Sequence, residues 1–209
     1  MNHTELFDDK KAAQAAAYFL FKAGGRLPVL KLMKLMYLAE RKSYELFSYP
    51  ITGDSMVSMD HGPVLSITLN NVNGMSSNND CWDEVISDRD GHDVALKDPS
   101  TIRSDEDLRD LSESDVISLK AIWDEFGHMT KYQIRDYTHE ALPEWQNPNG
   151  SSFPIRVERL LDALGFSEEK KQNVLTSLQL QAGLKVAIHR MKHVAASYRE
   201  PAETKRIPA

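Results

Sequence analysis

The segment between Pro28 and Pro50 constrains the fold most, because it predicts one long helix that is apolar on two sides. At about 100° per residue, its apolar side chains fall into two arcs. The first arc holds Leu32, Leu35, Met36, Ala39, Leu46 and Phe47, and the second holds Leu30, Met33, Tyr37 and Tyr44. A helix that is apolar on two sides is usually enclosed by other elements. We therefore expect residues 29–48 to form the central helix of a domain.

Helix signals recur along the rest of the chain. An alanine-rich amphipathic pattern begins near Asp8 and stops at Gly24-Gly25, and Pro63 suits the first turn of a short helix that stops at Gly74. In the second half, two capping boxes open further helices. They pair Ser112 with Asp115 and Thr130 with Gln133, and the helix that follows the first box ends at Gly127.

The β signals are few. Residues 51–62 look extended, and the segments 81–86 and 92–97 flank the turn-rich run SDRDG, which predicts a β-hairpin. The predicted fold is therefore mainly α (α+β), a compact helical domain with a small antiparallel β element or hairpin.

The C-terminal region predicts a helix that Ser167 caps and that bends or breaks near Gly183. We expect residues 1–166 to form the main domain, residues 167–198 to form a helix or helix pair packed on it, and residues 199–209 to be a loose tail.

Composition limits the class of function. A net charge of −6 argues against non-specific binding to nucleic acid or acidic membranes, which favour a basic surface. The single cysteine, Cys81, fits a reducing compartment, and the longest apolar run near the N-terminus is too short for a membrane span. We expect a soluble cytoplasmic protein with no membrane partner.

Patterns that carry catalytic or metal chemistry are weak. His189 and His193 share a helix face but lack the glutamate of a zinc-protease motif and lie among cations. Asp60 and His61 are adjacent, so in an extended segment their side chains point to opposite faces and form a poor acid–base pair. We therefore expect no enzyme activity, no metal and no cofactor.

The polar side of helix 29–48 allows two interpretations. Lys34, Arg41 and Lys42 lie on this side, with Leu38 between them. The strip is either an ordinary solvated face with one apolar residue, or a contact surface for an acidic partner with Leu38 as its anchor.

A DNA-binding alternative comes from residues 113–140, whose helix–turn–capped helix order matches the outline of a helix-turn-helix. Lys131, Gln133 and Arg135 would then contact the groove. The acidic residues of this segment argue against that interpretation.

Two stretches together resemble the signature of Panacea-domain proteins. In residues 31–64, KLMKLMYLAERKSYELFSYPITGDSMVSMDHGPV, a Lys-Leu-x-Lys-Leu-x-Tyr helix precedes a Pro-Ile strand start and a His-Gly-Pro-Val corner. In residues 111–145, LSESDVISLKAIWDEFGHMTKYQIRDYTHEALPEW, a Leu-Ser cap precedes a Phe-Gly break, a Thr-His pair and Pro-Glu-Trp. The residues that carry the resemblance are Tyr37, His61, Gly62, Pro63, Val64, Gly127, Thr130, Thr138, His139 and Trp145.

This resemblance implies an antitoxin of a type II toxin–antitoxin pair, like the SocA-like and GepA-like phage-associated members of the family. Such a protein binds and neutralises a cognate toxin encoded beside it, and at least one type of member delivers its toxin to an ATP-dependent protease. Most of the motif residues are of types that set turns and packing in the scaffold, and we expect His61 to be a structural hydrogen-bonding residue. A toxin would then contact more variable surface: the basic strip, residues 75–113, or the C-terminal helix and tail.

Overall fold

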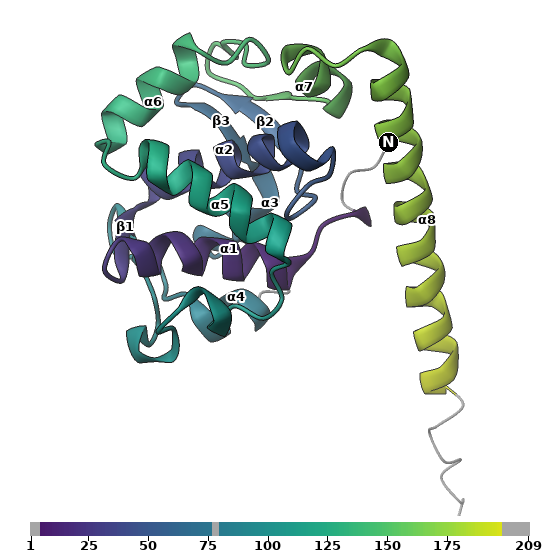
Figure 1. The fold of residues 1–209 in the computed structure, drawn as a ribbon. Coiled ribbons are helices and arrows are strands. Elements are labelled where there is room, and N and C mark those ends of the chain that lie inside the picture. Colours follow the sequence, from purple (N-terminus) through teal and green to yellow (C-terminus); the bar gives the residue numbers. More distant parts are fainter. Residues whose placement is uncertain (1–4, 77–79, 198–209) are drawn as a thin grey trace, which may run out of the picture.

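The computed structural model describes residues 5–76 and 80–197, and its architecture is mainly α, as predicted. Helix α2 (Val29–Phe47) lies at the centre, and twelve of its 19 residues are buried. Helices α1 (Asp9–Lys22), α5 (Glu113–Phe126) and α6 (Lys131–Glu140) pack around it (Figure 1). The central place of the doubly apolar helix is therefore confirmed, although Leu46 and Phe47 at its end are exposed.

The predicted helix ends are confirmed where local chemistry sets them. The Asp8 carboxylate accepts from the backbone N–H of Lys11 and caps α1. Both capping boxes are formed, Ser112 with Asp115 at α5 and Thr130 with Gln133 at α6. Each box satisfies two backbone N–H groups that a helix N-terminus leaves without an intrahelical acceptor.

One antiparallel sheet has the strand order β3-β2-β5. Strands β2 (Met56–Met59) and β3 (Gly62–Leu65) form a hairpin, and β5 (Phe153–Pro154) pairs with the other edge of β2. The prediction that Pro63 opens a helix is wrong, because Pro63 lies within β3 opposite Ser58. The positive φ of Gly62, +92°, returns the chain beside β2, and helix α3 (Ser66–Val72) begins only afterwards.

A second, two-stranded sheet pairs β1 (Arg26–Pro28) with β4 (Asp93–Ala95). The prediction of a hairpin between residues 81–86 and 92–97 is therefore wrong for its first half. That half forms helix α4 (Asp80–Val85), which packs against α1 and buries Trp82. A single β-bridge, between Ile86 and Leu96, is the β pairing between the two predicted strands.

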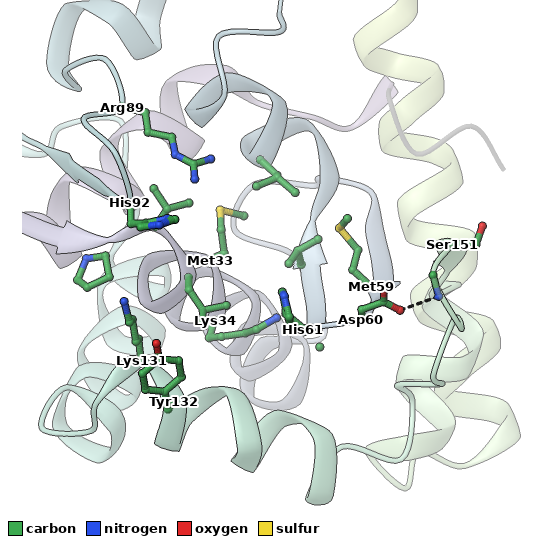
Figure 2. Close-up of a pocket in the computed structure, with 17 residues that line it drawn as sticks. Met33, Lys34, Met59, Asp60, His61, Arg89, His92, Lys131, Tyr132 and Ser151 are labelled. Carbon is green, nitrogen blue, oxygen red and sulfur yellow. Dashed lines mark hydrogen bonds between the residues drawn. The ribbon is translucent and has the colours of Figure 1, made fainter.

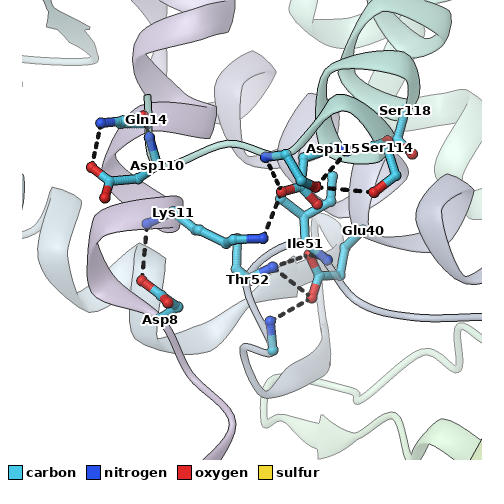
Figure 3. Close-up of polar contacts among 12 residues, drawn as sticks. Asp8, Lys11, Gln14, Glu40, Ile51, Thr52, Asp110, Ser114, Asp115 and Ser118 are labelled. Carbon is cyan, nitrogen blue, oxygen red and sulfur yellow. Dashed lines mark hydrogen bonds and ion pairs between the residues drawn. The ribbon is translucent and has the colours of Figure 1, made fainter. Parts of the chain in front are cut away.

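Buried polar groups fasten the loops around the central helix. The Glu40 carboxylate of α2 accepts from the backbone N–H groups of Ile51, Thr52 and Gly53, as Figure 3 shows. Nearby, the Lys11 ammonium of α1 lies 2.6 Å from the Asp115 carboxylate of α5. These contacts position the segment that leads into β2. Between α4 and α5, two short 3₁₀ turns, Pro99–Thr101 and Asp105–Asp107, complete the exposed acidic connection.

The chain ends with α7 (Val157–Ala163) and the long α8 (Glu168–Ser197). Helix α8 continues through Gly183, so the predicted bend or break there is wrong. Its first half buries Val174, Leu178 and Ala182, whereas the side chains of residues 183–191 are mostly exposed where the helix runs along the side of the domain (Figure 1). The expected loose tail, residues 199–209, lies outside the described residues, and the predicted domain boundary at residue 166 stays a prediction. In the described part of the chain, no helix has both the length and the apolar character needed to cross a bilayer.

Candidate functional site

Three polar side chains spaced three residues apart on α2 each reach a different loop. Lys31 Nζ donates to the carbonyl oxygen of Gly127 at 2.7 Å, and Lys34 Nζ donates to that of Pro63 at 2.7 Å. The Tyr37 hydroxyl lies 3.1 Å from Glu144 Oε1. The Lys-Leu-x-Lys-Leu-x-Tyr pattern of the sequence is therefore a row of internal fasteners that holds the α5–α6 turn, the β-hairpin and the segment after α6.

The predicted basic contact strip requires four side chains at the surface, and this expectation is wrong for two of them. Lys34 is 0% exposed and Leu38 is 4% exposed, so neither reaches the surface. Leu38 is enclosed because α5 and α6 pack over this side of α2. Arg41 forms an ion pair with the buried Glu144 at 2.9 Å, and Lys42 forms one with Glu45 on the same helix. Partner binding by Arg41 and Lys42 stays a prediction.

The corner of the hairpin is tightly packed around Gly62. A Cβ at this position would lie 2.7 Å from Thr138 Oγ1 and 3.0 Å from both Lys34 Nζ and His139 Cδ2. Only glycine combines this space with the positive φ that the turn requires. The Gly-Pro-Val corner, Lys34 of the first signature block and Thr138-His139 of the second block therefore meet at one place.

The corner is braced by an aromatic pair from the second block. The rings of His139 and Trp145 are stacked, with centroids 4.4 Å apart and an interplanar angle of 11°. Trp145 Nε1 donates to the carbonyl oxygen of Met59 at 3.1 Å, which ties this pair to the end of β2. Val64 and Thr138 of the same signature are also buried. The expected structural role of these motif residues stays a prediction.

Burial lowers the pKa of two basic side chains at the corner, Lys34 and His139. It lowers the pKa of Lys34 to about 7, because no solvent reaches the amine. Burial also lowers the pKa of His139, and the positive charges of Lys34 and Arg135 lower it further. His139 Nε2 is buried and has no hydrogen-bond partner among the described residues. Both shifts favour the uncharged form of these groups relative to a lysine or histidine in water.

A cavity of about 620 Å³ opens beside this corner, between α2, the hairpin and the start of α6 (Figure 2). Apolar side chains that include Leu30, Met33 and Leu69 form part of its lining. Its cationic and titratable lining groups come from distant parts of the sequence. They are Lys34, His61, Arg89, His92 and Lys131. Asp60, the acidic residue of the lining, accepts from the backbone N–H of Gly150 at 2.9 Å.

The chemistry of this cavity suits an anionic group with an apolar body, because its basic groups outnumber its acidic one. Sequence reasoning missed the cavity. His61, Arg89 and Lys131 belong to three separate elements, and no spacing pattern connects them.

The groups considered for catalysis are poorly arranged for it. Asp60 and His61 form the exposed two-residue turn of the hairpin, and the Asp60 carboxylate is engaged by Gly150. Burial and a hydrogen bond to Asp9 raise the pKa of the Cys81 thiol, which lowers its thiolate fraction. Within the described ranges, no three histidine, cysteine or acidic side chains gather as metal ligands would.

The side chains proposed for DNA contact are engaged locally. Gln133 Oε1 accepts from the backbone N–H of Thr130 and so completes the capping box. Arg135 forms an ion pair with Asp136, and both Lys131 and Arg135 lie over the ring of Tyr132. The DNA-binding alternative stays a prediction, and this geometry gives it no added support.

Comparison with known proteins identifies the framework described above. No curated protein and no solved structure matches this sequence significantly. A family model does match, over residues 32–146, and it is described as antitoxin SocA-like, Panacea domain. The match covers more than half of the chain and spans Lys34, the hairpin corner, both capping boxes and Trp145. The chain therefore belongs to the SocA-like antitoxin family, whose members carry the Panacea domain.

Proposed function

We propose that this protein is the antitoxin of a type II toxin–antitoxin pair and neutralises a cognate toxin by binding it directly. The observation that carries the proposal is the family match over residues 32–146. That region contains two of the three internal fasteners of α2, Lys34 and Tyr37, and the packed hairpin corner. Such a framework presents surfaces at fixed positions, which is what a binding protein requires.

The proposed activity is non-enzymatic and takes place in the cytoplasm. Support comes from the family, from the raised pKa of Cys81 and from the engaged carboxylate of Asp60. A single half-buried free cysteine also suits a reducing compartment.

Co-expression tests the proposal. The open reading frame adjacent to this gene is expressed alone and together with this chain, and the number of viable cells is counted. We expect toxicity from the neighbour alone and growth when both are present. A neighbour that is harmless alone, or that kills equally in the presence of this chain, contradicts the proposal.

Neutralisation could follow from blocking the toxin or from its delivery to an ATP-dependent protease. The two routes differ in the lifetime of the toxin. In the delivery route, this chain shortens the half-life of the toxin, and deletion of the protease restores toxicity. In the blocking route, the toxin persists in an inactive complex and the protease deletion has no effect.

A further inference from the structure

From its middle onward, α8 carries a stripe of large apolar side chains that the rest of the protein leaves exposed. Leu180 is 70% exposed, Leu184 61%, Ile188 39% and Met191 62%. Their spacing of four, four and three residues places them within about 80° of one another around the helix. We call these four residues the α8 stripe. Isolated exposed leucines are ordinary, but a continuous stripe indicates an interaction surface.

A different face of α8 holds the helix against the domain. Val174, Leu178 and Ala182 are buried. The Lys185 ammonium then donates to the backbone carbonyl oxygens of Leu6 and Phe7. Because these contacts fix the rotation of the helix, the α8 stripe is presented in a defined direction and the packing of the fold leaves it uncovered.

The stripe borders a groove between α8 and the domain. Leu184 and Ile188 line a cavity of about 360 Å³ together with Tyr49 and Pro50, which follow α2. Tyr49 itself is 38% exposed. An apolar partner surface that covered the stripe would therefore also contact the end of α2.

Charge identifies the kind of partner. Residues 172–197 contain three basic residues, Lys185, Arg190 and Lys192, and no aspartate or glutamate, although the whole chain has a net charge of −6. The apolar stripe thus lies on the basic segment of an acidic protein. Pairing with a second copy through this segment would place like charges together, which opposes self-association.

We propose that the α8 stripe is the docking element for the cognate toxin, and that the toxin presents an apolar surface with acidic residues at its rim. This inference rests on the proposed antitoxin function. The stripe supplies the apolar anchors, and the net positive charge of residues 172–197 steers the acidic partner.

Two double variants with equal charge change test the proposal. L180D/L184D places two carboxylates on the stripe, whereas Q172D/Q179D places two on exposed positions of the same helix outside it. The affinity of each full-length protein for the purified product of the adjacent open reading frame is measured by calorimetry, and neutralisation is scored by co-expression. Thermal melts verify that the variants fold, as expected for exposed positions.

We expect L180D/L184D to weaken binding on the order of 100-fold and to lose neutralisation. Q172D/Q179D should behave like the wild-type protein, and added salt should weaken wild-type binding. If wild type and L180D/L184D neutralise equally, the stripe is not the docking element, while the antitoxin function stands. If wild type itself does not neutralise, the proposed function fails instead. A wild-type dimer that L180D/L184D converts to a monomer would assign the stripe to a second copy and overturn the proposal.

Discussion

The amine of Lys34 lies 2.7 Å from the carbonyl oxygen of Pro63, so a fully buried lysine of the central helix fastens the corner of the β-hairpin. The two residues are 29 positions apart and belong to the same signature block. Burial lowers the pKa of this amine to about 7. The protonation state of the amine that makes this contact therefore changes near neutral pH.

The first prediction concerns the pH dependence of stability at Lys34. Between pH 7 and about 10.5, the unfolded chain binds more protons at this position than the folded protein does. The free energy of unfolding should therefore rise with pH across this window, by at most about 1.4 kcal/mol per pH unit from this group. In Lys34→Met this contribution is absent. The free energy of unfolding of wild type minus that of the variant should therefore increase from pH 7 to pH 9.5.

Urea unfolding at several pH values measures this difference. Lys42→Met on the same helix is the matched control, because Lys42 lies at the surface beside Glu45. Its stability should follow the wild-type curve at every pH. A constant difference between wild type and Lys34→Met over the whole range would contradict the prediction.

The second prediction concerns space at the corner. Gly62→Ala adds a Cβ that would lie 2.7 Å from Thr138 Oγ1, at a residue whose φ is +92°. We expect a loss of about 2–4 kcal/mol of stability from crowding and strain together. Gly91→Ala separates the two effects, because Gly91 also has a positive φ of +60° but nothing lies within 4 Å of its added Cβ. It should cost about 1 kcal/mol. Equal losses in denaturant melts would show that crowding at Gly62 is unimportant.

The third prediction concerns Glu40, which fastens the loop before β2 (Figure 3). Burial raises its pKa to about 7, so between pH 4.5 and pH 7 the folded protein binds more protons here than the unfolded chain. Wild-type stability should therefore fall as pH rises through this window. Glu40→Gln removes that dependence and turns an amide NH₂ toward backbone N–H donors, at a cost of about 1–3 kcal/mol. The control is Glu45→Gln at the exposed end of α2. A variant that keeps the wild-type slope in melts from pH 4.5 to pH 7 would assign the titration to another group.

These contacts also show what the sequence could predict. The capping boxes at Ser112 and Thr130 were predictable because a cap joins residues three apart, and the central place of helix 29–48 followed from its two apolar arcs. Pro63 misled the prediction because its fixed φ suits both a first helical turn and an edge of a hairpin. Only the sheet pairing with β2 decides between the two.

The candidate site was less predictable for a related reason. Lysines at positions 31 and 34 look like a solvated face in sequence, and their acceptors, the carbonyls of Gly127 and Pro63, carry no side-chain signal. The cavity depends on residues as far apart as His61 and Lys131. Long-range packing of this kind cannot be derived from local periodicity.

The last prediction compares two leucines of α8 that differ only in where they face. Leu178 is 0% exposed and packs on the domain, whereas Leu180 is 70% exposed on the α8 stripe. Leu178→Ala should cost about 2–4 kcal/mol because it leaves a cavity, and Leu180→Ala should change stability by less than about 0.5 kcal/mol. If the proposed docking holds, affinity for the product of the adjacent open reading frame should show the opposite order, since Leu180 is exposed to a partner and Leu178 is not. Denaturant melts and calorimetry on the same two proteins measure both quantities. A large stability loss in Leu180→Ala would mean that the stripe is part of the folded core, and its role as a docking surface would then have to be abandoned.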